Sequence, residues 1–334
     1  MDRIVFAAFN TSRRPEFQLK TLATKDNRGN ISFSKTCFGE GSEKVLEGMS
    51  KLQTEIQKVA PSVKVGKSTL KDKSTLNMAY IPGIDLEHRL LDAVIANNHE
   101  SVEKLLSIYD NLLDALSSSV KPPHRYRNDV FGPAFYKKFT KSTMVQPGLL
   151  DLMFDNIIIS NSKPIIIDYE WSFDHDLPRD YIVARALLWF GQRHAQLFKL
   201  HSRRINVIKL ADNIYLPEAI LTRYKHIHYA FKATLEIEWR YFQPWVSGKQ
   251  AGALNTPSLD ESYVNSADQP IFALDELESM SHELMDAINQ VHEYERIIGN
   301  LRQDLEAITN TTYYKAGRRA FRMLKKVSSR NKSS

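Results

Sequence analysis

The sequence predicts a two-lobed α+β fold, in which a small antiparallel sheet precedes a larger helical region and a separate C-terminal helix. Three observations predict it. Short apolar runs divided by polar turns fill residues 1–40, long stretches with helical spacing begin near residue 85, and a heptad pattern follows a polar segment at 247–270. The chain has 334 residues, 43% of them hydrophobic, so it is long enough to bury a substantial core.

Composition excludes several classes of protein. Cys37 is the single cysteine, which excludes an internal disulfide framework and a zinc site built from several thiolates. No apolar run reaches the roughly 18–20 residues that a membrane-spanning helix needs. The first residues, MDRIVFAAFN, include an acid at Asp2 and do not have the pattern of a signal peptide. We therefore expect a cytoplasmic protein.

The positive charge is concentrated at one end of the sequence. The net charge is +6, and residues 313–334 carry eight Lys and Arg residues with no Asp or Glu. Without those eight charges, the first 312 residues have a net charge of −2. The body of the protein does not have the charge of a nucleic-acid-binding domain, and no nucleic-acid partner is expected.

The first 82 residues predict a small lobe built on strands. Three apolar segments are expected to form antiparallel strands: Ile4–Phe9, Phe17–Thr24 and Ile31–Phe38. A hairpin turn is expected at Asn27–Asn30, and alternation places Phe33 and Lys35 on one face of the third strand. The remaining elements expected in this lobe are a helix and two strands: Ser42–Val59, Val63–Val65 and Leu76–Ile81.

The next part of the chain predicts a helical lobe that contains one short hairpin. Amphipathic spacing predicts helices over Ser101–Leu116, Asp180–Leu200 and Leu216–Trp239. Two apolar runs, Ile157–Ile159 and Pro164–Ile167, lie on either side of a four-residue turn. Near the end of this lobe lies an aromatic cluster that is interpreted either as core packing or as a sugar-binding platform: Trp239, Tyr241, Phe242 and Trp245.

A heptad pattern begins after the polar segment. Apolar residues repeat every seven positions in two series: Leu277, Leu284, Val291, Ile298 and Leu305, and then Met280, Ala287, Tyr294, Leu301 and Ile308. This is the core pattern of a coiled coil, so we expect a homo-oligomer formed through residues 277–308. The alternative is a long helix packed back on the preceding domain.

The basic C-terminal residues also have an amphipathic pattern. Between Tyr313 and Val327, apolar side chains share one helical face and Lys and Arg occupy the other. Basic amphipathic helices bind anionic lipid, so residues 313–334 predict peripheral association with the inner face of a membrane. The alternative is a solvated terminus.

The segment most informative about chemistry runs from Asp151 to Trp171. Asp151 and Asn156 lie five residues apart in DLMFDN, and the predicted hairpin that follows ends at Asp168. A hairpin of this length can bring Asp168 back beside Asn156. A carboxylate and an amide carbonyl are hard oxygen ligands suited to Mg²⁺, and Asp151 then remains able to accept a proton. Phosphoryl transfer requires both functions.

This pattern resembles the catalytic and metal-binding loops of the protein-kinase-like superfamily. The ending DYEW, from Asp168 to Trp171, resembles the aminoglycoside phosphotransferase-like branch, and the resemblance covers roughly residues 1–245. It implies a small lobe at 1–82 and a large lobe at 83–246, and the patterns described above add a linker at 247–270, a coiled coil at 271–312 and a basic tail at 313–334. The layout also resembles kinase modules of bacterial surface-polysaccharide (O-antigen) biosynthesis.

The resemblance implies a role for individual residues. Asp151 becomes the catalytic base, and Asn156 and Asp168 become ligands of Mg²⁺. Lys35 becomes the strand lysine that binds the α- and β-phosphates of ATP. Its partner on the following helix is expected to be Glu47, with Glu43 as the alternative. The segment YIPGIDLE, which starts at Tyr80, resembles the connection between the lobes, so the backbone of Ala79 and Ile81 is expected to contact adenine.

The departures from the family pattern define two functional hypotheses. The turn NTSRRP, starting at Asn10, replaces a glycine-rich turn, and Leu149 and Met153 replace a histidine and a lysine of protein kinases. These differences argue against a protein kinase. The first hypothesis is an ATP- and Mg²⁺-dependent phosphotransferase that acts on a hydroxyl of a small molecule or glycan. The second is an inactive kinase-like scaffold that organises a glycosyltransferase or methyltransferase complex through its coiled coil.

Overall fold

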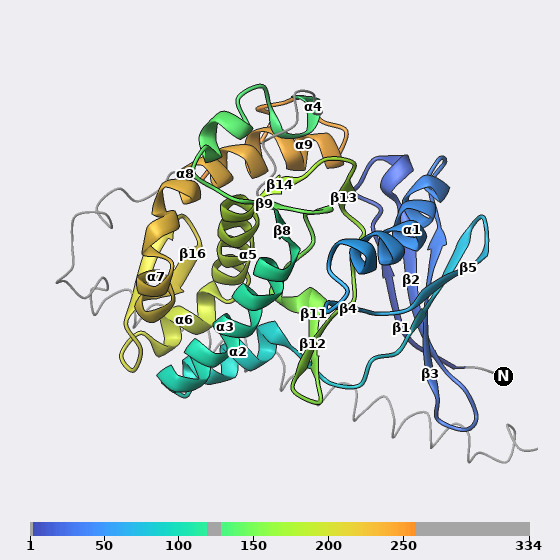
Figure 1. Ribbon diagram of the computed structural model, residues 1–334, viewed down its shortest axis with the longest axis horizontal. Coiled ribbons are helices and arrows are strands. Elements are labelled where there is room, and N and C mark those ends of the chain that lie inside the picture. The colour runs from blue at the N-terminus through green and yellow to red at the C-terminus, as the bar shows by residue number, and fades with distance from the viewer. Residues whose placement is uncertain (1–2, 119–127, 255, 258–334) are drawn as a thin grey trace, which may run out of the picture. The chain divides into compact units, whose positions relative to one another are not determined.

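The computed structural model describes residues 3–118, 128–254 and 256–257 (Figure 1). These residues form a sheet-rich lobe followed by a helical lobe, so the predicted two-lobed α+β fold class is confirmed. The predicted coiled coil at 271–312 and basic tail at 313–334 lie outside the described residues, and both stay predictions. None of the helices in the described ranges combines the length and the apolar character that crossing a membrane requires.

The N-terminal sheet has five antiparallel strands in the order β1-β2-β3-β6-β5. Their bounds are β1 (Arg3–Phe9), β2 (Leu19–Lys25), β3 (Ile31–Cys37), β5 (Ser68–Asp72) and β6 (Thr75–Ala79). Gly29 adopts a φ of 89° in the predicted turn between β2 and β3, a conformation that costs glycine little. The sequence did not predict β5, because this edge strand is largely polar and exposed.

One face of this sheet is buried, and it carries Lys35. Thr21, Lys35 and Leu76 are cross-strand partners, and directly paired residues of antiparallel strands point to the same face. The buried side chains of the sheet lie on this face: Leu19, Ala23, Lys35 and Leu76. Helix α1 (Glu43–Val59) follows β3 and buries the apolar side predicted for it, through Leu46, Met49, Leu52 and Ile56.

A second sheet connects the two lobes. Its strand order is β4-β12-β11-β7, with β4 (Lys64–Val65), β12 (Lys163–Ile166), β11 (Ile157–Ser160) and β7 (Ile84–Asp85). Strands β11 and β12 form the predicted hairpin, in which Asn161 and Ser162 both have positive φ, as a two-residue type I′ turn requires. Strand β4 pairs in parallel with β12, so a segment of the small lobe holds the hairpin of the large lobe.

The helical lobe is built around one helix that is buried on nearly all sides. This helix is α5 (Arg179–Arg193), and Figure 1 shows it at the centre of the lobe. The other helices are α2 (Leu86–Ile95), α3 (His99–Leu116), α4 (Asn128–Phe131), α6 (Ala195–His201), α7 (Glu218–Arg223), α8 (His228–Ile237) and α9 (Gln243–Val246). A π-helix over Glu238–Phe242 connects α8 to α9.

Short elements complete the fold. The remaining strands are β8 (Ser117–Ser118), β9 (Met144–Val145), β10 (Gly148–Leu149), β13 (Ser172–Phe173), β14 (Leu177–Pro178), β15 (Val207–Ala211) and β16 (Ile214–Pro217). In the described part of the chain, 3₁₀ turns are found at Pro15–Phe17, Tyr136–Phe139, Phe154–Asn156 and Lys225–Ile227.

Three helix predictions are wrong in their bounds. The helix predicted at Ser101 begins at His99, because Asn98 is its cap and accepts a hydrogen bond from the Ser101 amide. The helix predicted over Asp180–Leu200 is divided at His194 into α5 and α6. The helix predicted over Leu216–Trp239 starts as strand β16, whose hairpin with β15 turns at Asn213 with a φ of 56°.

Candidate active site

The hairpin brings Asn156 and Asp168 together. Ile157 pairs with Ile166 across the hairpin, and the amide of Ile167 donates a 2.9 Å hydrogen bond to the backbone carbonyl of Asn156. The two predicted metal ligands therefore lie at the same end of β11 and β12. The amide group of Asn156 donates through Nδ2 to the Asp151 carbonyl at 3.1 Å, which leaves its oxygen Oδ1 as the free acceptor.

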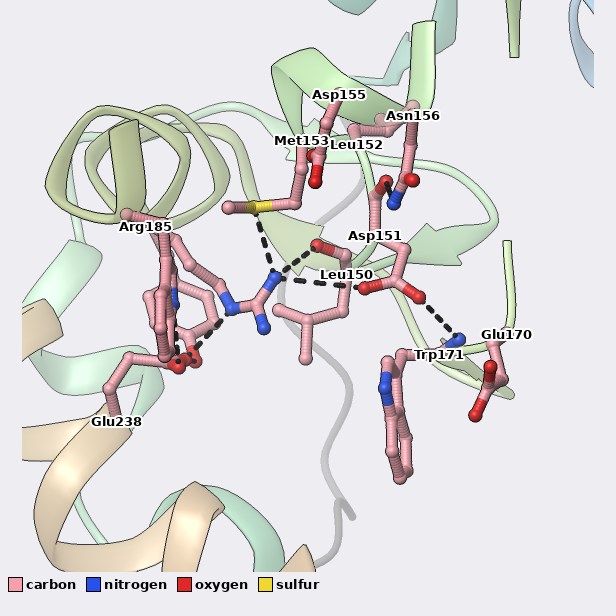
Figure 2. A network of polar contacts seen from close by, with 12 residues as sticks. Leu150, Asp151, Leu152, Met153, Asp155, Asn156, Glu170, Trp171, Arg185 and Glu238 are labelled. Atoms are coloured by element: carbon pink, nitrogen blue, oxygen red, sulfur yellow. Dashed lines mark hydrogen bonds and ion pairs between the residues drawn. The ribbon is translucent and has the colours of Figure 1, made fainter. Parts of the chain in front are cut away.

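The loop that carries Asp151 is fixed by the residues that follow Asp168. Strand β10, just before Asp151, pairs with strand β13, just after Trp171. The Leu150 amide also donates to the Trp171 carbonyl at 3.0 Å. The Trp171 amide in turn donates to Oδ2 of Asp151 at 3.1 Å. Figure 2 shows the Asp151 carboxylate between Trp171 and Arg185, with Asn156 against the backbone of Asp151. The three residues of the predicted pattern are thus held in one connected loop structure.

Asp151 lies in a largely buried position between opposing charges. Its side chain is only 12% exposed, and its Oδ1 lies 3.8 Å from Nη1 of Arg185. Burial raises the pKa of Asp151 to about 7, and the carboxylates of Asp168 and Glu170 add to this rise while Arg185 opposes it. A carboxyl with a pKa near neutrality is suited to accepting a proton from a substrate hydroxyl.

A buried polar network holds Arg185, and we call it the support cluster: Arg185, Glu238, Tyr181 and Trp189. The Glu238 carboxylate accepts hydrogen bonds from Arg185 Nε at 3.0 Å, from the Tyr181 hydroxyl at 2.6 Å and from Trp189 Nε1 at 3.3 Å. Arg185 Nη1 then donates to the Leu150 carbonyl at 3.1 Å, one residue before Asp151 (Figure 2). The support cluster therefore positions the Asp151 loop through the hydrogen bond from Arg185 to the Leu150 carbonyl.

Lys35 reaches the hairpin from the sheet. Its Nζ lies 2.8 Å from both carboxylate oxygens of Asp168 and 2.7 Å from Oε2 of Glu170. Burial lowers the pKa of Lys35, but Asp168 and Glu170 outweigh it and hold this pKa above its ordinary value. Glu170 also forms an ion pair with Arg13, through its other oxygen. We call Lys35, Asp168, Glu170 and Arg13 the site cluster.

The predicted partner of Lys35 is wrong. Among the described residues, no ion pair joins Lys35 to Glu47 or to Glu43, although α1 does follow β3 as expected. The carboxylate that accompanies Asp168 at Lys35 is Glu170, two residues further along the chain. Glu170 stands in the DYEW motif, so the signal was present in the sequence, but the family resemblance implied a partner on the helix that follows β3.

The predicted adenine-contacting segment lies at the connection between the lobes. The Ala79 amide donates to the Lys67 carbonyl at 2.9 Å, so this N–H is already used by the small lobe. The ring of Tyr80 stacks on Phe33 at 6.1 Å and is 47% exposed. Gly83 is packed against the hairpin, since a Cβ there would lie 2.6 Å from Ile158. The backbone of Ile81 remains for the adenine contact, which stays a prediction.

A cavity of about 270 Å³ opens beside Asp151. Its lining combines charged groups with an aromatic wall: Arg13, Asp151, Met153, Asp155, Asn156, Trp171, Arg185, Trp189, Arg193, Phe242, Gln243 and Val246. Trp189 is backed by Trp239, with the two rings stacked at 5.7 Å. A larger cavity of about 490 Å³, near the start of α3, contains none of these residues. The smaller cavity is the one connected to the predicted chemistry.

Comparison with known proteins gives similarities in structure only. No family model matches the chain, and no curated protein matches it. The ethanolamine kinase of Plasmodium vivax has 13% identity and a TM-score of 0.34, covering 72% of this chain and 76% of its own. A type I macrolide 2′-phosphotransferase has 10% identity and a TM-score of 0.36, covering 74% and 88%. The aminoglycoside phosphotransferase of Alicyclobacillus acidocaldarius has 13% identity and a TM-score of 0.31, covering 86% and 90%.

Proposed function

We propose that this protein is a phosphotransferase that moves the γ-phosphoryl group of Mg·ATP to a hydroxyl of a small molecule or glycan. The observation that carries the proposal is that Asp151, Asn156 and Asp168 of one loop and hairpin meet Lys35 of the distant strand β3 at one end of the β11–β12 hairpin. A proton acceptor, two oxygen ligands and a buried cation are the components that phosphoryl transfer requires.

The residues present fit a magnesium ion. Mg²⁺ is usually held by one or two protein oxygens together with substrate phosphates. The Asp168 side chain is 32% exposed. Asn156 is oriented by a hydrogen bond from its Nδ2, which does not involve its Oδ1. Both side chains could therefore provide an oxygen ligand. Within the described part of the chain, no group of three His, Cys, Asp or Glu side chains is placed to hold a metal ion. When bound, the ion would neutralise phosphate charge.

The small lobe provides a surface for the nucleotide. Ala23, Phe33 and Met78 are cross-strand partners on the face that carries Lys35, and they offer an apolar cover for a nucleobase. Lys35 lies on the same face with its ammonium group directed at the hairpin, where it can bind phosphate oxygens. The base is therefore expected under the sheet, with its phosphates extending toward Asp168.

Asp151 is the group that would act on the acceptor. The acceptor oxygen attacks the γ-phosphorus, its proton passes to the Asp151 carboxylate, and the bond to the β-phosphate oxygen breaks with its electron pair leaving on ADP. The Trp171 amide and Asn156 hold Asp151 in one orientation for this transfer. Its raised pKa matches proton transfer near neutral pH.

The lining of the cavity beside Asp151 supports one class of acceptor. The cavity beside Asp151 has Trp171, Trp189 and Phe242 on its wall together with several hydrogen-bonding groups. Aromatic faces beside fixed polar groups suit a sugar ring, which has apolar faces and hydroxyl edges. A glycan acceptor in bacterial surface-polysaccharide synthesis is supported by this wall and by the domain layout. Oligomerisation through residues 277–308 and membrane contact through residues 313–334 complete the proposal.

The second candidate, an inactive scaffold, is favoured by two observations. Both carboxylate oxygens of Asp168 are bound to Lys35, and the turn that replaces the glycine-rich loop has no glycine. The two functions differ in nucleotide binding, since a scaffold of this kind needs none. Isothermal titration of the full chain with Mg·ATP therefore separates them.

The experiment compares two substitutions at the proposed site with one nearby control. Asp168→Asn is expected to abolish measurable Mg·ATP binding, whereas Asp151→Asn should bind normally but transfer phosphate to free hexoses at least about 10²-fold more slowly than wild type. Asp174→Asn alters a carboxylate that is 93% exposed in the same segment and should behave like wild type. Equal Mg·ATP binding by wild type and Asp168→Asn would contradict the proposal.

A further inference from the structure

The turn between β1 and β2 has a structure that leaves its backbone poorly suited to binding phosphate. A glycine-rich turn binds phosphate through free backbone N–H groups. Here those N–H groups already donate to protein carbonyls at Asn10, Arg13, Arg14, Phe17 and Gln18. Pro15 has no N–H to offer. Within residues 10–15, only the amides of Thr11 and Ser12 are without such a bond in the described part of the chain, so phosphate contacts from this turn would depend mainly on side chains.

The same turn is docked on the large lobe. The Arg14 amide donates to the Val246 carbonyl at 2.8 Å, which ties the turn to α9. The ring of Phe17 packs on Trp245 at 4.6 Å and on Trp171 at 5.0 Å. These backbone and aromatic contacts fix the turn against the large lobe, so the positions of its side chains relative to Asp151 and the hairpin are defined.

Arg13 is the side chain of this turn that reaches the site. Its guanidinium group pairs with Glu170 and lies 5.1 Å from the centre of the Trp171 ring. Glu170 binds Lys35 through one carboxylate oxygen and Arg13 through the other, so the two cations flank the same carboxylate. Arg13 also lines the cavity that contains Asp151. Arg13 therefore shares the Glu170 carboxylate with the proposed phosphate-binding lysine and lines the same cavity as the proposed base.

We propose that Arg13 binds the γ-phosphoryl group of ATP during its transfer, in place of the backbone contacts of a glycine-rich turn. This inference rests on the proposed function. A guanidinium has five N–H donors in one plane, and the ion pair with Glu170 uses a single nitrogen, Nη1. The remaining donors are available for the phosphoryl oxygens that gain negative charge as the acceptor oxygen bonds to phosphorus and ADP leaves.

Its neighbour Arg14 has a different environment and provides a matched control. Arg14 pairs with Glu16 of the same turn, and its guanidinium lies over Phe17 at 5.7 Å and over Trp245 at 5.9 Å. It is not part of the lining of the Asp151 cavity. If the turn serves only to dock the lobes, loss of Arg14 should matter at least as much as loss of Arg13.

The test compares affinity for two nucleotides that differ in the γ-phosphate. The full-length protein is titrated with Mg·ADP and with a magnesium complex of a non-hydrolysable ATP analogue that has an imido β–γ bridge. Arg13→Ala is expected to lower affinity for the ATP analogue about tenfold or more and to leave affinity for ADP unchanged. Arg13→Lys should give an intermediate loss, and Arg14→Ala should change neither affinity.

The outcomes separate this inference from the proposed function. If wild type binds both nucleotides and Arg13→Ala keeps the wild-type ratio of affinities, Arg13 does not contact the γ-phosphate. An equal loss in Arg14→Ala and Arg13→Ala would also overturn the inference, since it would indicate docking of the turn. Wild-type protein that binds neither nucleotide would overturn the proposed function itself. Thermal unfolding of each variant verifies that it is folded. If Arg13→Ala is unstable, Arg13→Lys takes its place in the comparison, because lysine can keep the ion pair with Glu170.

Discussion

The support cluster and the site cluster lie on opposite sides of Asp151, and they differ in how much of their charge is open to solvent. In the support cluster, the side chains of Glu238 and Arg185 are 0% and 6% exposed. In the site cluster, Asp168 and Arg13 are 32% and 24% exposed, although Lys35 and Glu170 are buried. The first cluster is closed to solvent, whereas the second leaves part of the charge of Asp168 and Arg13 exposed.

From this difference we expect the support cluster to contribute mainly to stability and the site cluster mainly to the proposed ligand binding. Removing one partner of a fully buried ion pair leaves the other charge unpaired and out of contact with water. Such a pair therefore holds its side chains in one arrangement, and losing either partner lowers stability. A partly open cluster can exchange a protein partner for a ligand at a smaller cost. Asp151 is coupled to both clusters, through Arg185 on one side and through Asp168 and Glu170 on the other. Three measurements test this division of roles.

The largest effect on stability is expected in the support cluster. Glu238→Ala leaves Arg185, Tyr181 and Trp189 without the carboxylate that they share, and it should lower the free energy of unfolding by about 3–5 kcal/mol. Urea denaturation measures this loss. As a control, Lys138→Ala removes an ion pair with Glu236 whose side chains are about one-third exposed, and it should cost less than about 1 kcal/mol.

A double substitution checks that the cost comes from the unpaired charge. Replacing both partners, with Arg185→Met and Glu238→Leu, should recover part of the stability that Glu238→Ala loses, because no buried charge is then left alone. If Glu238→Ala costs no more than Lys138→Ala, the support cluster does not have the structural role described here.

The second effect is expected in the site cluster and should fall mainly on ligand binding. Lys35→Met removes the cation from Asp168 and Glu170, but Asp168 can be hydrated and Glu170 keeps Arg13. We expect a loss of about 1–3 kcal/mol in the free energy of unfolding and a loss of about tenfold or more in Mg·ATP affinity. Lys20→Met, on the opposite face of the same sheet, is the matched control and should change neither strongly.

The comparison of the two clusters would fail if Lys35→Met destabilised the protein as much as Glu238→Ala while Mg·ATP binding was kept. That result would make Lys35 a structural cation. Denaturation and titration performed on the same preparations give both quantities.

The parts of the site that the sequence predicts are those encoded over a short stretch of chain. Asp151, Asn156 and Asp168 lie within one loop and hairpin, and a hairpin of known length determines which of its ends meet. Lys35 was placed by the alternation of its strand, which fixes the face of the sheet on which it lies. The sheet strands and the hairpin turn follow from equally local signals.

The parts that the sequence does not predict depend on contacts between distant segments. Glu238 is 53 residues from Arg185, and Arg13 is 157 residues from Glu170. No local pattern specifies such pairs, although an Arg inside the apolar helix α5 is a signal that a buried partner exists. Glu47 was expected at Lys35 because a helix follows β3, but the rotation and position of α1 are set by packing that sequence spacing does not define.

The last expected effect concerns Asp151, the residue that both clusters influence, and it is spread over about three pH units. Its ordinary pKa is 3.8 and its pKa in the folded protein is raised to about 7, so between these values the folded protein holds a proton that the unfolded chain has released. Stability should therefore decrease as pH rises through this window, by at most about 1.4 kcal/mol per pH unit.

Asp151→Asn has no such proton to release. The free energy of unfolding of Asp151→Asn minus that of wild type should therefore increase between about pH 4 and pH 7 and be constant above pH 7. Urea denaturation of both proteins at several pH values measures the difference, in which the other titrating groups largely cancel. Parallel curves across this range would show that the carboxyl of Asp151 is ionised throughout, and that the Arg185 side dominates its environment.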